Sequence, residues 1–465
     1  MKKVFVFCIG GTGIRVMKSI TMLMAGGMST NGYTVVPIIL DPHLDLEEKT
    51  KLDSLIRNYK DIFNKSINAQ KDTLTPLSGF FNSEVKWIEE LNNQTNDTQQ
   101  VSGSKEPFRS YIKESSLATD DINNFLIQAL FSTKNLESPL SVGFKGNPNV
   151  GTVVLGEMIE GDDRFKSFKQ HCEKGDRVFI ISSIFGGTGA SGYPLLEKKI
   201  RQSDSLPAVK NALMGAVTVL PYYGLKDPAT TGSDIDSANF YTKTKAALAY
   251  YKDNVLSDYL YYAGETSLTQ VYENDEKKQD DKAHFIELVA ASALFDFLKR
   301  EKPDSTQYLT RGIEDNQSSM DIESLGSGYK EIVKSVADYK LLGMLVEELP
   351  KESYYPLKMN RGFDENFYKD ASYNALKKFT EIYDKWYDEL SSNKRAFAPL
   401  NTSSVTNMEG WVKKVSLDAK DDSYYLLKMI EASNKNKDKT HDNKFRFFLQ
   451  FAHEAIDKYT AKILK

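Results

Sequence analysis

The stretch Val178-Phe-Ile-Ile-Ser-Ser-Ile-Phe-Gly-Gly-Thr-Gly-Ala-Ser-Gly192 places an apolar run directly before a glycine-rich turn. The apolar run predicts a buried strand, and the residues from Pro194 onward predict a helix. The turn has glycines at 186, 187, 189 and 192, which allow the backbone to adopt positive φ and to approach an anion closely. Free N–H groups at the start of the following helix favour a phosphate there. We therefore predict a phosphate-binding strand–turn–helix unit of an α/β domain.

A second glycine turn, Gly10-Gly11-Thr12-Gly13, follows the first apolar run of the chain. The spacing of Gly187, Gly189 and Gly192 satisfies the G-x-G-x-x-G pattern of dinucleotide-binding folds, which is a weak signal when it stands alone. In the second turn Val16 stands where that pattern needs its third glycine, and the chain has no G-x-x-x-x-G-K-[ST] motif. The amino-terminal glycine turn therefore fits neither the dinucleotide fingerprint nor a P-loop.

Three further segments occur in a recognisable order. The loop Gly146-Asn147-Pro148-Asn149-Val150-Gly151 lies between the two glycine turns, Asp41 follows the second apolar run, and Val217-Thr218-Val219-Leu220-Pro221 ends a later one. With these segments, residues 1–263 resemble the tubulin/FtsZ superfamily, and a fainter likeness continues to about residue 298. The resemblance implies an α/β nucleotide-binding domain with a mainly parallel sheet, a central helix, and GTP or GDP held on several loops.

The resemblance also implies which residues contact the nucleotide. The phosphates would lie on three glycine loops, through Gly10, Gly11, Thr12, Gly13, Gly146, Asn147, Gly186, Gly187, Thr188 and Gly189. Asp41 would contact the nucleotide or a Mg²⁺ ion that accompanies its phosphates, although a carboxylate after a strand also caps helices. Asn239 would read guanine, because a side-chain amide both donates and accepts, and its alternative role is that of a helix cap. Ile235 stands where relatives often have an aromatic residue that stacks on the base, and Phe240 or Tyr241 would take that place.

In tubulin and FtsZ, acidic residues of the next subunit complete the hydrolytic site. The nearest equivalent here is Asp280-Asp281-Lys282-Ala283-His284-Phe285-Ile286-Glu287-Leu288. Glu287 alone keeps an acid in register, and His284 replaces the first acid. Glu287 is therefore the candidate catalytic residue that would orient the attacking water, with a solvated helix glutamate as the alternative. We expect at most a weak GTPase whose turnover depends on head-to-tail self-association.

The resemblance gives the domain boundaries. Residues 1–233 would form the nucleotide-binding domain, 234–263 the central core helix, and 264–465 a divergent C-terminal domain. Aromatic and aliphatic residues recur at helical spacing in Tyr373–Leu390 and Lys444–Leu464, so the C-terminal domain is predicted to be mostly helical and to offer a surface for a protein partner. Residues 42–140 are predicted to form a mostly helical insertion.

Composition limits the class of protein. The chain has 465 residues, of which 40% are hydrophobic, enough to bury the cores of two domains. Its formal net charge of −4 gives no global attraction to nucleic acid or to an anionic membrane. Two cysteines and five scattered histidines argue against a disulfide framework and a metal site built from protein ligands. No signal peptide or membrane span is visible, and we expect a cytoplasmic protein.

Three classes of function stay open at this point. The first is a GTP-binding cytoskeletal protein that hydrolyses GTP within a filament. The second is a scaffold that binds GTP or GDP without hydrolysis and uses occupancy to fix its shape. The third is a dinucleotide-binding oxidoreductase of the Rossmann type that uses the Gly187 loop. Against the third class, Leu220-Pro221-Tyr222-Tyr223 stands where the acidic residue of that fold is expected.

Overall fold

The fold is built on a six-stranded sheet in the order β2-β1-β3-β4-β6-β8, in which every neighbouring pair is parallel. A computed structural model describes residues 1–42, 47–67, 79–92, 106–118, 120–140, 144, 146–225, 237–265, 270–272, 282–313, 319–320, 330–350, 363–393, 396–397, 399 and 443–463. The strands are β1 (Lys3–Ile9), β2 (Thr34–Leu40), β3 (Arg177–Ser183), β4 (Leu213–Val219), β6 (Tyr259–Glu265) and β8 (Gln307–Ile313). The expectation of an α/β fold with a parallel sheet is confirmed.

Strands β1, β2, β3 and β4 are largely apolar. All residues of β2, and all but the first residue of β1, β3 and β4, are buried. Continuous burial is typical of parallel strands with helices on both faces, because a parallel pair needs a crossover segment that covers the sheet.

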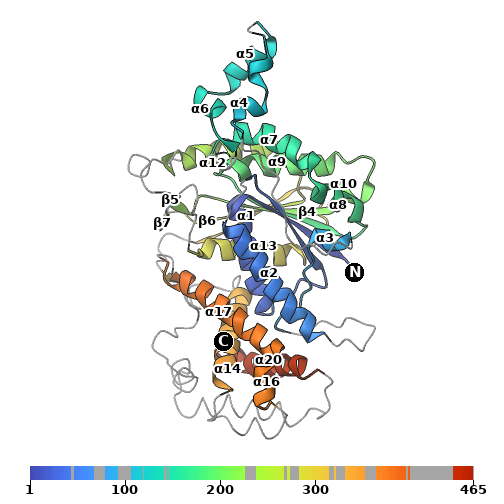
Figure 1. The fold of residues 1–465 in the computed structure, drawn as a ribbon, viewed down its shortest axis with the longest axis vertical. Helices are drawn as coiled ribbons and strands as arrows, with labels where there is room; N and C mark the ends of the chain where they lie inside the picture. The colour runs from blue at the N-terminus through green and yellow to red at the C-terminus, as the bar shows by residue number, and fades with distance from the viewer. Residues whose placement is uncertain are drawn as a thin grey trace.

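Helices lie on both faces of the sheet (Figure 1). One face carries α1 (Gly10–Ala25), α2 (Glu47–Ser66) and α13 (Phe285–Phe297). The other carries α7 (Pro148–Gly161), α8 (Asp163–His171), α9 (Gly187–Arg201), α10 (Pro207–Lys210) and α12 (Phe240–Asn254). The helices α1 and α13 are almost wholly buried, since they lie between the sheet and the C-terminal helices.

The segment 234–263, expected as one central helix, is not one helix. Its described part consists of η3 (Ser237–Asn239), α12 and the first residues of β6, and residues 234–236 lie outside the described part. Most residues of α12 are not buried, whereas β6 pairs with β4 and β8. Two elements beyond residue 264, α13 and β8, belong to the central sheet and its cover.

The described residues from 330 onward lie mainly in helices. These are α14 (Lys330–Glu348), α16 (Glu365–Lys369), α17 (Ala371–Ser391) and α20 (Lys444–Ile463), and the two-residue strand β10 (Ala396–Phe397) pairs with β9 (Ser319–Met320). They pack on α1 and α2 (Figure 1): Ser335 Oγ donates to the carbonyl of Leu23 at 3.0 Å, and the rings of Tyr59 and Phe379 lie 6.4 Å apart. None of the helices described is both long enough and apolar enough to cross a membrane.

The region between β2 and α7 contains α2, α3 (Ile88–Leu91), α4 (Phe108–Tyr111), η1 (Glu114–Ser116), α5 (Ile122–Leu130) and α6 (Thr133–Leu136). Whereas α2 packs on α1, the short helices α4, α5 and α6 form a projection at the end of the molecule opposite α16 and α20 (Figure 1). A small two-stranded sheet, β5 (Tyr223–Leu225) with β7 (Gln270–Tyr272), lies beside the main sheet.

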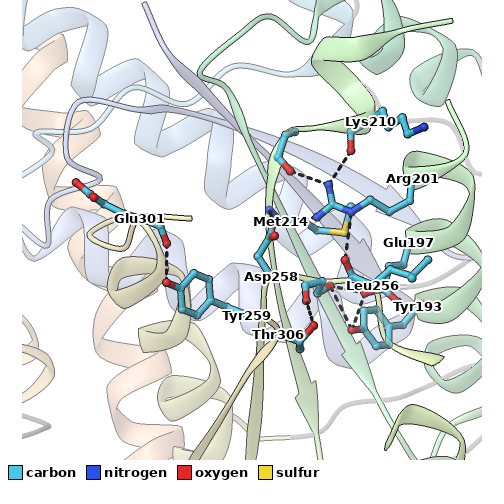
Figure 2. Close-up of polar contacts among 12 residues, drawn as sticks. Tyr193, Glu197, Arg201, Lys210, Met214, Leu256, Asp258, Tyr259, Glu301 and Thr306 are labelled. Atoms are coloured by element: carbon cyan, nitrogen blue, oxygen red, sulfur yellow. Dashed lines mark hydrogen bonds and ion pairs between the residues drawn. The ribbon is translucent and has the colours of Figure 1, made fainter. Parts of the chain in front are cut away.

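Buried polar contacts fix the C-terminal half of α9 near the amino ends of β4 and β6 (Figure 2). Both Ser257 Oγ and Tyr193 OH donate to Glu197 Oε1, at 2.5 and 3.1 Å. Arg201 Nη2 lies 2.9 Å from Asp258 Oδ2. Because this end of α9 is held at the amino edge, its N-terminus is positioned at the carboxyl edge of the sheet.

Candidate functional site

Three glycine loops meet at the carboxyl edge of the sheet: one follows β1, one follows β3, and one precedes α7. A Cβ atom on Gly10 would lie 3.4 Å from Thr188 Cβ. A Cβ atom on Gly187 would lie 3.1 Å from the backbone nitrogens of both Gly146 and Asn147. The loops therefore approach to van der Waals distance, and the structure brings together predicted phosphate-binding residues from all three.

The predicted glycines have different roles within these turns. Gly10 and Gly146 have φ of +72° and +74°, which favour glycine. Gly13 instead serves close packing, because its Cβ would lie 2.7 Å from the carbonyl carbon of Cys8. Gly189 does the same on β3, where its Cβ would lie 2.5 Å from the carbonyl oxygen of Ser183. Substitution of Gly13 or Gly189 would therefore disturb the fold as well as a ligand.

The N-termini of α1, α7 and α9 all begin at these loops. Their N-cap residues Ile9, Asn147 and Gly186 make no side-chain cap, and none of the three helices has an acidic residue in its first turn. The first N–H groups of a helix need partners outside the helix. Three helix dipoles also place partial positive charge at this edge, so the arrangement can bind an anion such as phosphate. Gly11 and Thr12 lie in the first turn of α1.

Asp41 lies beside the Gly10 turn. Leu40 is the sheet partner of Ile9, so the residues that follow the two strands, Asp41 and Gly10, leave the sheet at the same level. Asp41 is buried, and its carboxylate is close enough to Lys49 to act on the pKa of that lysine, which burial lowers. The predicted acid is thus brought to the glycine edge.

The start of α12 also lies at this edge. Lys243 Nζ donates to the carbonyl oxygen of Gly146 at 2.7 Å. Asn239 lies four residues earlier, one turn of helix away on the same side of α12. It is exposed, and its side chain does not cap α12. The structure therefore places Asn239 near the glycine loops, as the guanine-reading role requires.

An aromatic cluster separates the Gly186 loop from α12. The ring of Phe185 lies 4.8 Å from that of Phe240 and 5.6 Å from that of Tyr223. Phe240 is buried in this cluster, whereas Tyr241 is 46% exposed. Of the two residues considered for stacking on a base, Tyr241 is the accessible one. Ile235 lies outside the described residues.

Glu287 lies in the interior, at the start of α13. Arg15 Nε is 2.9 Å from Glu287 Oε1, and the hydroxyl of Tyr222 donates to the same oxygen at 2.7 Å. Arg15 Nη2 donates to the Tyr222 hydroxyl at 2.6 Å. Burial raises the pKa of the Glu287 carboxyl, while Arg15 and Tyr222 act in the opposite direction. Glu287 is 2% exposed, so it does not lie on a surface that another subunit could approach, and the expected role in trans has no support in this geometry.

His284 is also buried and forms the N-cap of α13. Its Nδ1 accepts from the backbone N–H of Ile286 at 3.1 Å, and its Nε2 lies 3.7 Å from Glu265 Oε1. The backbone N–H of His284 donates to Glu287 Oε2 at 3.2 Å. His284 and Glu287, which the resemblance aligned with catalytic acids, thus form a capping box here.

Sequence reasoning missed Lys243 and the partners of Glu287. A signal for Lys243 was present, because it lies one helical turn after Asn239 and would share its face. Within the described residues, no three His, Cys, Asp or Glu side chains are grouped to hold a metal ion. No protein-family model matches the chain, and no curated protein matches it.

Proposed function

We propose that the carboxyl edge of the sheet binds the phosphates of a guanine nucleotide and that the chain is a tubulin/FtsZ-like protein. The observation that carries the proposal is the meeting of three glycine loops, each at the uncapped N-terminus of a helix. A single loop of this kind occurs in many α/β folds. Three loops within contact distance favour a ligand with several phosphates. Mg²⁺ would accompany those phosphates, and Asp41 is the nearest predicted carboxylate.

The orientation of the nucleotide follows from α12. With the phosphates on the glycine loops, the base would extend toward Asn239. Lys243 would stabilise the site in two ways. It fixes the Gly146 loop through its 2.7 Å hydrogen bond, and it adds positive charge beside the phosphates.

The proposal favours a nucleotide-dependent scaffold over an efficient GTPase. Hydrolysis needs a carboxylate near the attacking water. The one acid that the resemblance aligns with the catalytic acids is Glu287, which lies in the interior and contacts Arg15 and Tyr222. The glycine loops could still stabilise charge on a γ-phosphate and give slow turnover. In this proposal, occupancy fixes the three loops relative to one another and so determines the shape presented to a partner or to further copies.

One observation keeps a dinucleotide-binding oxidoreductase as a second candidate. An acid at the end of the strand beside the first βα turn is where a Rossmann fold holds the ribose hydroxyls, and Asp41 occupies that position. Against it, Val16 replaces the third glycine of the first turn and is fully buried.

Calorimetric titration with GTP, ATP and NAD tests the proposal on wild type and on Gly187→Val. The valine side chain would push against the Gly146 loop, and we expect GTP affinity to fall at least about tenfold. Gly156→Ala is the matched control, because it lies on α7 with no atom within 4 Å of the added Cβ. Circular dichroism should show that both variants are folded. NAD binding without GTP binding would overturn the assignment and favour the second candidate.

A further inference from the structure

Helix α5 exposes an apolar stripe on the projection. Ile122, Phe125, Leu126 and Leu130 are 73, 64, 52 and 63% exposed, and no residue of the helix is buried. Their spacing of three, four and eight residues places them on one side of the helix. Exposed apolar residues are ordinary when they are scattered, but a contiguous stripe marks an interaction surface.

The helix that carries the stripe is held firmly by its other side. The ring of Phe131, directly after α5, lies 4.8 Å from that of Phe108. Asn149 Nδ2 on α7 donates to the carbonyl of Leu130 at 3.2 Å, and Gln128 Nε2 donates to Glu114 Oε1 at 2.8 Å. The stripe is thus preorganised on the body of the protein, which lowers the entropic cost of binding.

We propose that the stripe is the contact between two copies of this chain, with α5 of one copy packed antiparallel on α5 of the other. The stripe matches itself under a twofold axis through Leu126. Ile122 and Leu130 lie four residues before and after Leu126, about 6 Å along the helix in each direction. In the pair, Leu126 therefore meets Leu126 of the other copy, and Ile122 meets Leu130.

Charge favours the same arrangement. Asp120 and the N-cap residue Asp121 lie at the start of α5, and the exposed Lys134 lies four residues after its end. An antiparallel pair brings the acidic end of each helix to the end of the other that carries Lys134. It also aligns the two helix dipoles with opposite ends together. A parallel pair would place like charges side by side.

The position of the projection allows the contact. The helices α4, α5 and α6 extend beyond α7 and α9, away from the rest of the chain (Figure 1). A second copy can therefore reach α5 without meeting the C-terminal helices. Such a twofold contact uses the same patch on both copies and closes as a dimer. It differs from head-to-tail association and does not rest on the proposed nucleotide.

Cysteine cross-linking tests the geometry. The two native cysteines are free and buried, so an introduced cysteine is the reactive one. Full-length Ile122→Cys mixed with Leu130→Cys should form a disulfide-linked heterodimer under mild oxidation, and more of it than either variant forms alone. Cross-linking of each variant mainly to itself would overturn the antiparallel arrangement.

Sedimentation velocity over a range of concentrations tests the dimer itself. Wild type should show a reversible monomer–dimer equilibrium. Leu126→Glu should weaken the dimer at least about tenfold. It replaces a leucine that the dimer contact would bury, and it places two like charges together at the twofold axis. Asn124→Glu adds the same charge to the same helix on the side opposite the stripe and should dimerise like wild type.

Neither Leu126 nor Asn124 is buried, so thermal unfolding should be unchanged and a loss of dimer cannot be ascribed to misfolding. A wild-type chain that stays monomeric at hundreds of micromolar, or a dimer unaffected by Leu126→Glu, would contradict the proposal. In either case the stripe would belong to a different partner.

Discussion

Glu287, Arg15 and Tyr222 form a closed set in which each polar group contacts the other two. Sequence register alone suggested that Glu287 faces a neighbouring subunit. The sequence could not reveal the set, because Arg15, Tyr222 and Glu287 come from three distant segments that only the tertiary fold brings together. Its geometry predicts a structural role, in which Glu287 compensates the charge of a buried arginine.

We predict that Glu287→Gln lowers the free energy of unfolding by about 3 kcal/mol, because it leaves the Arg15 guanidinium buried without its counter-charge. Denaturant unfolding at neutral pH measures the change. Glu331→Gln is the control, since the contact between Glu331 and Lys299 is largely exposed and should be worth less than about 0.5 kcal/mol. If Glu287→Gln were as stable as wild type but lost GTP turnover, the role in trans would regain support.

The glycine positions could be predicted from the sequence because their constraint is local. A glycine turn between an apolar run and a helix already indicates where the backbone must approach another group. The sequence did not show which glycines pack against the sheet and which bring the loops together. Gly13 and Gly189 pack against the sheet, whereas Gly10, Gly146 and Gly187 bring the three loops together.

At the scale of elements, the helix and strand between residues 240 and 265 show where sequence reasoning fails. The run Tyr259-Leu-Tyr-Tyr is apolar and short, and such a run fits a buried helix as well as a strand. The family resemblance favoured a continuous helix. In the structure α12 ends at Asn254, and the connection to β6 is held by Ser257 and Asp258 through their contacts with α9.

The contact between α12 and the Gly146 loop gives a prediction at the same scale. Lys243→Met removes a charge-assisted hydrogen bond to the loop, and we expect nucleotide affinity to fall about tenfold, or about 1.4 kcal/mol. Titration calorimetry with GTP measures this. Lys245→Met is the matched control, because Lys245 is an exposed lysine on the same helix. Equal affinities for the two variants would mean that Lys243 does not support the site.

For the whole molecule, the C-terminal helices contribute a pH dependence. Burial raises the pKa of Asp338 on α14 to about 6, from an ordinary value of 3.8, although Lys334 opposes the shift. The folded state therefore binds this proton more tightly than the unfolded state. The stabilisation from protonated Asp338 is present below about pH 4 and is lost as the pH rises through about 6.

We predict that Asp338→Asn flattens the dependence of unfolding free energy on pH between 4 and 7, removing a fall of about 2–3 kcal/mol. Denaturant unfolding at several pH values measures the slope. Asp304→Asn removes an exposed carboxylate and is the control. A slope in Asp338→Asn as steep as in wild type would show that other buried carboxyls dominate.

The expectation of a mainly parallel sheet came from the family resemblance, and the strand order was not predicted. The extent of the sheet was not predicted either, because β8 lies beyond residue 298, where the family resemblance fades. The arrangement of α14, α17 and α20 on α1 and α2 also depends on long-range packing that no local pattern encodes.

The most direct test of the central claim is the identity of the nucleotide that the freshly purified protein carries. Denaturing the protein and analysing the released material by chromatography and mass spectrometry identifies it. The account predicts GDP or GTP in near-equimolar amount with the chain. Release of NAD, or no release together with no thermal stabilisation by added GTP, would contradict it.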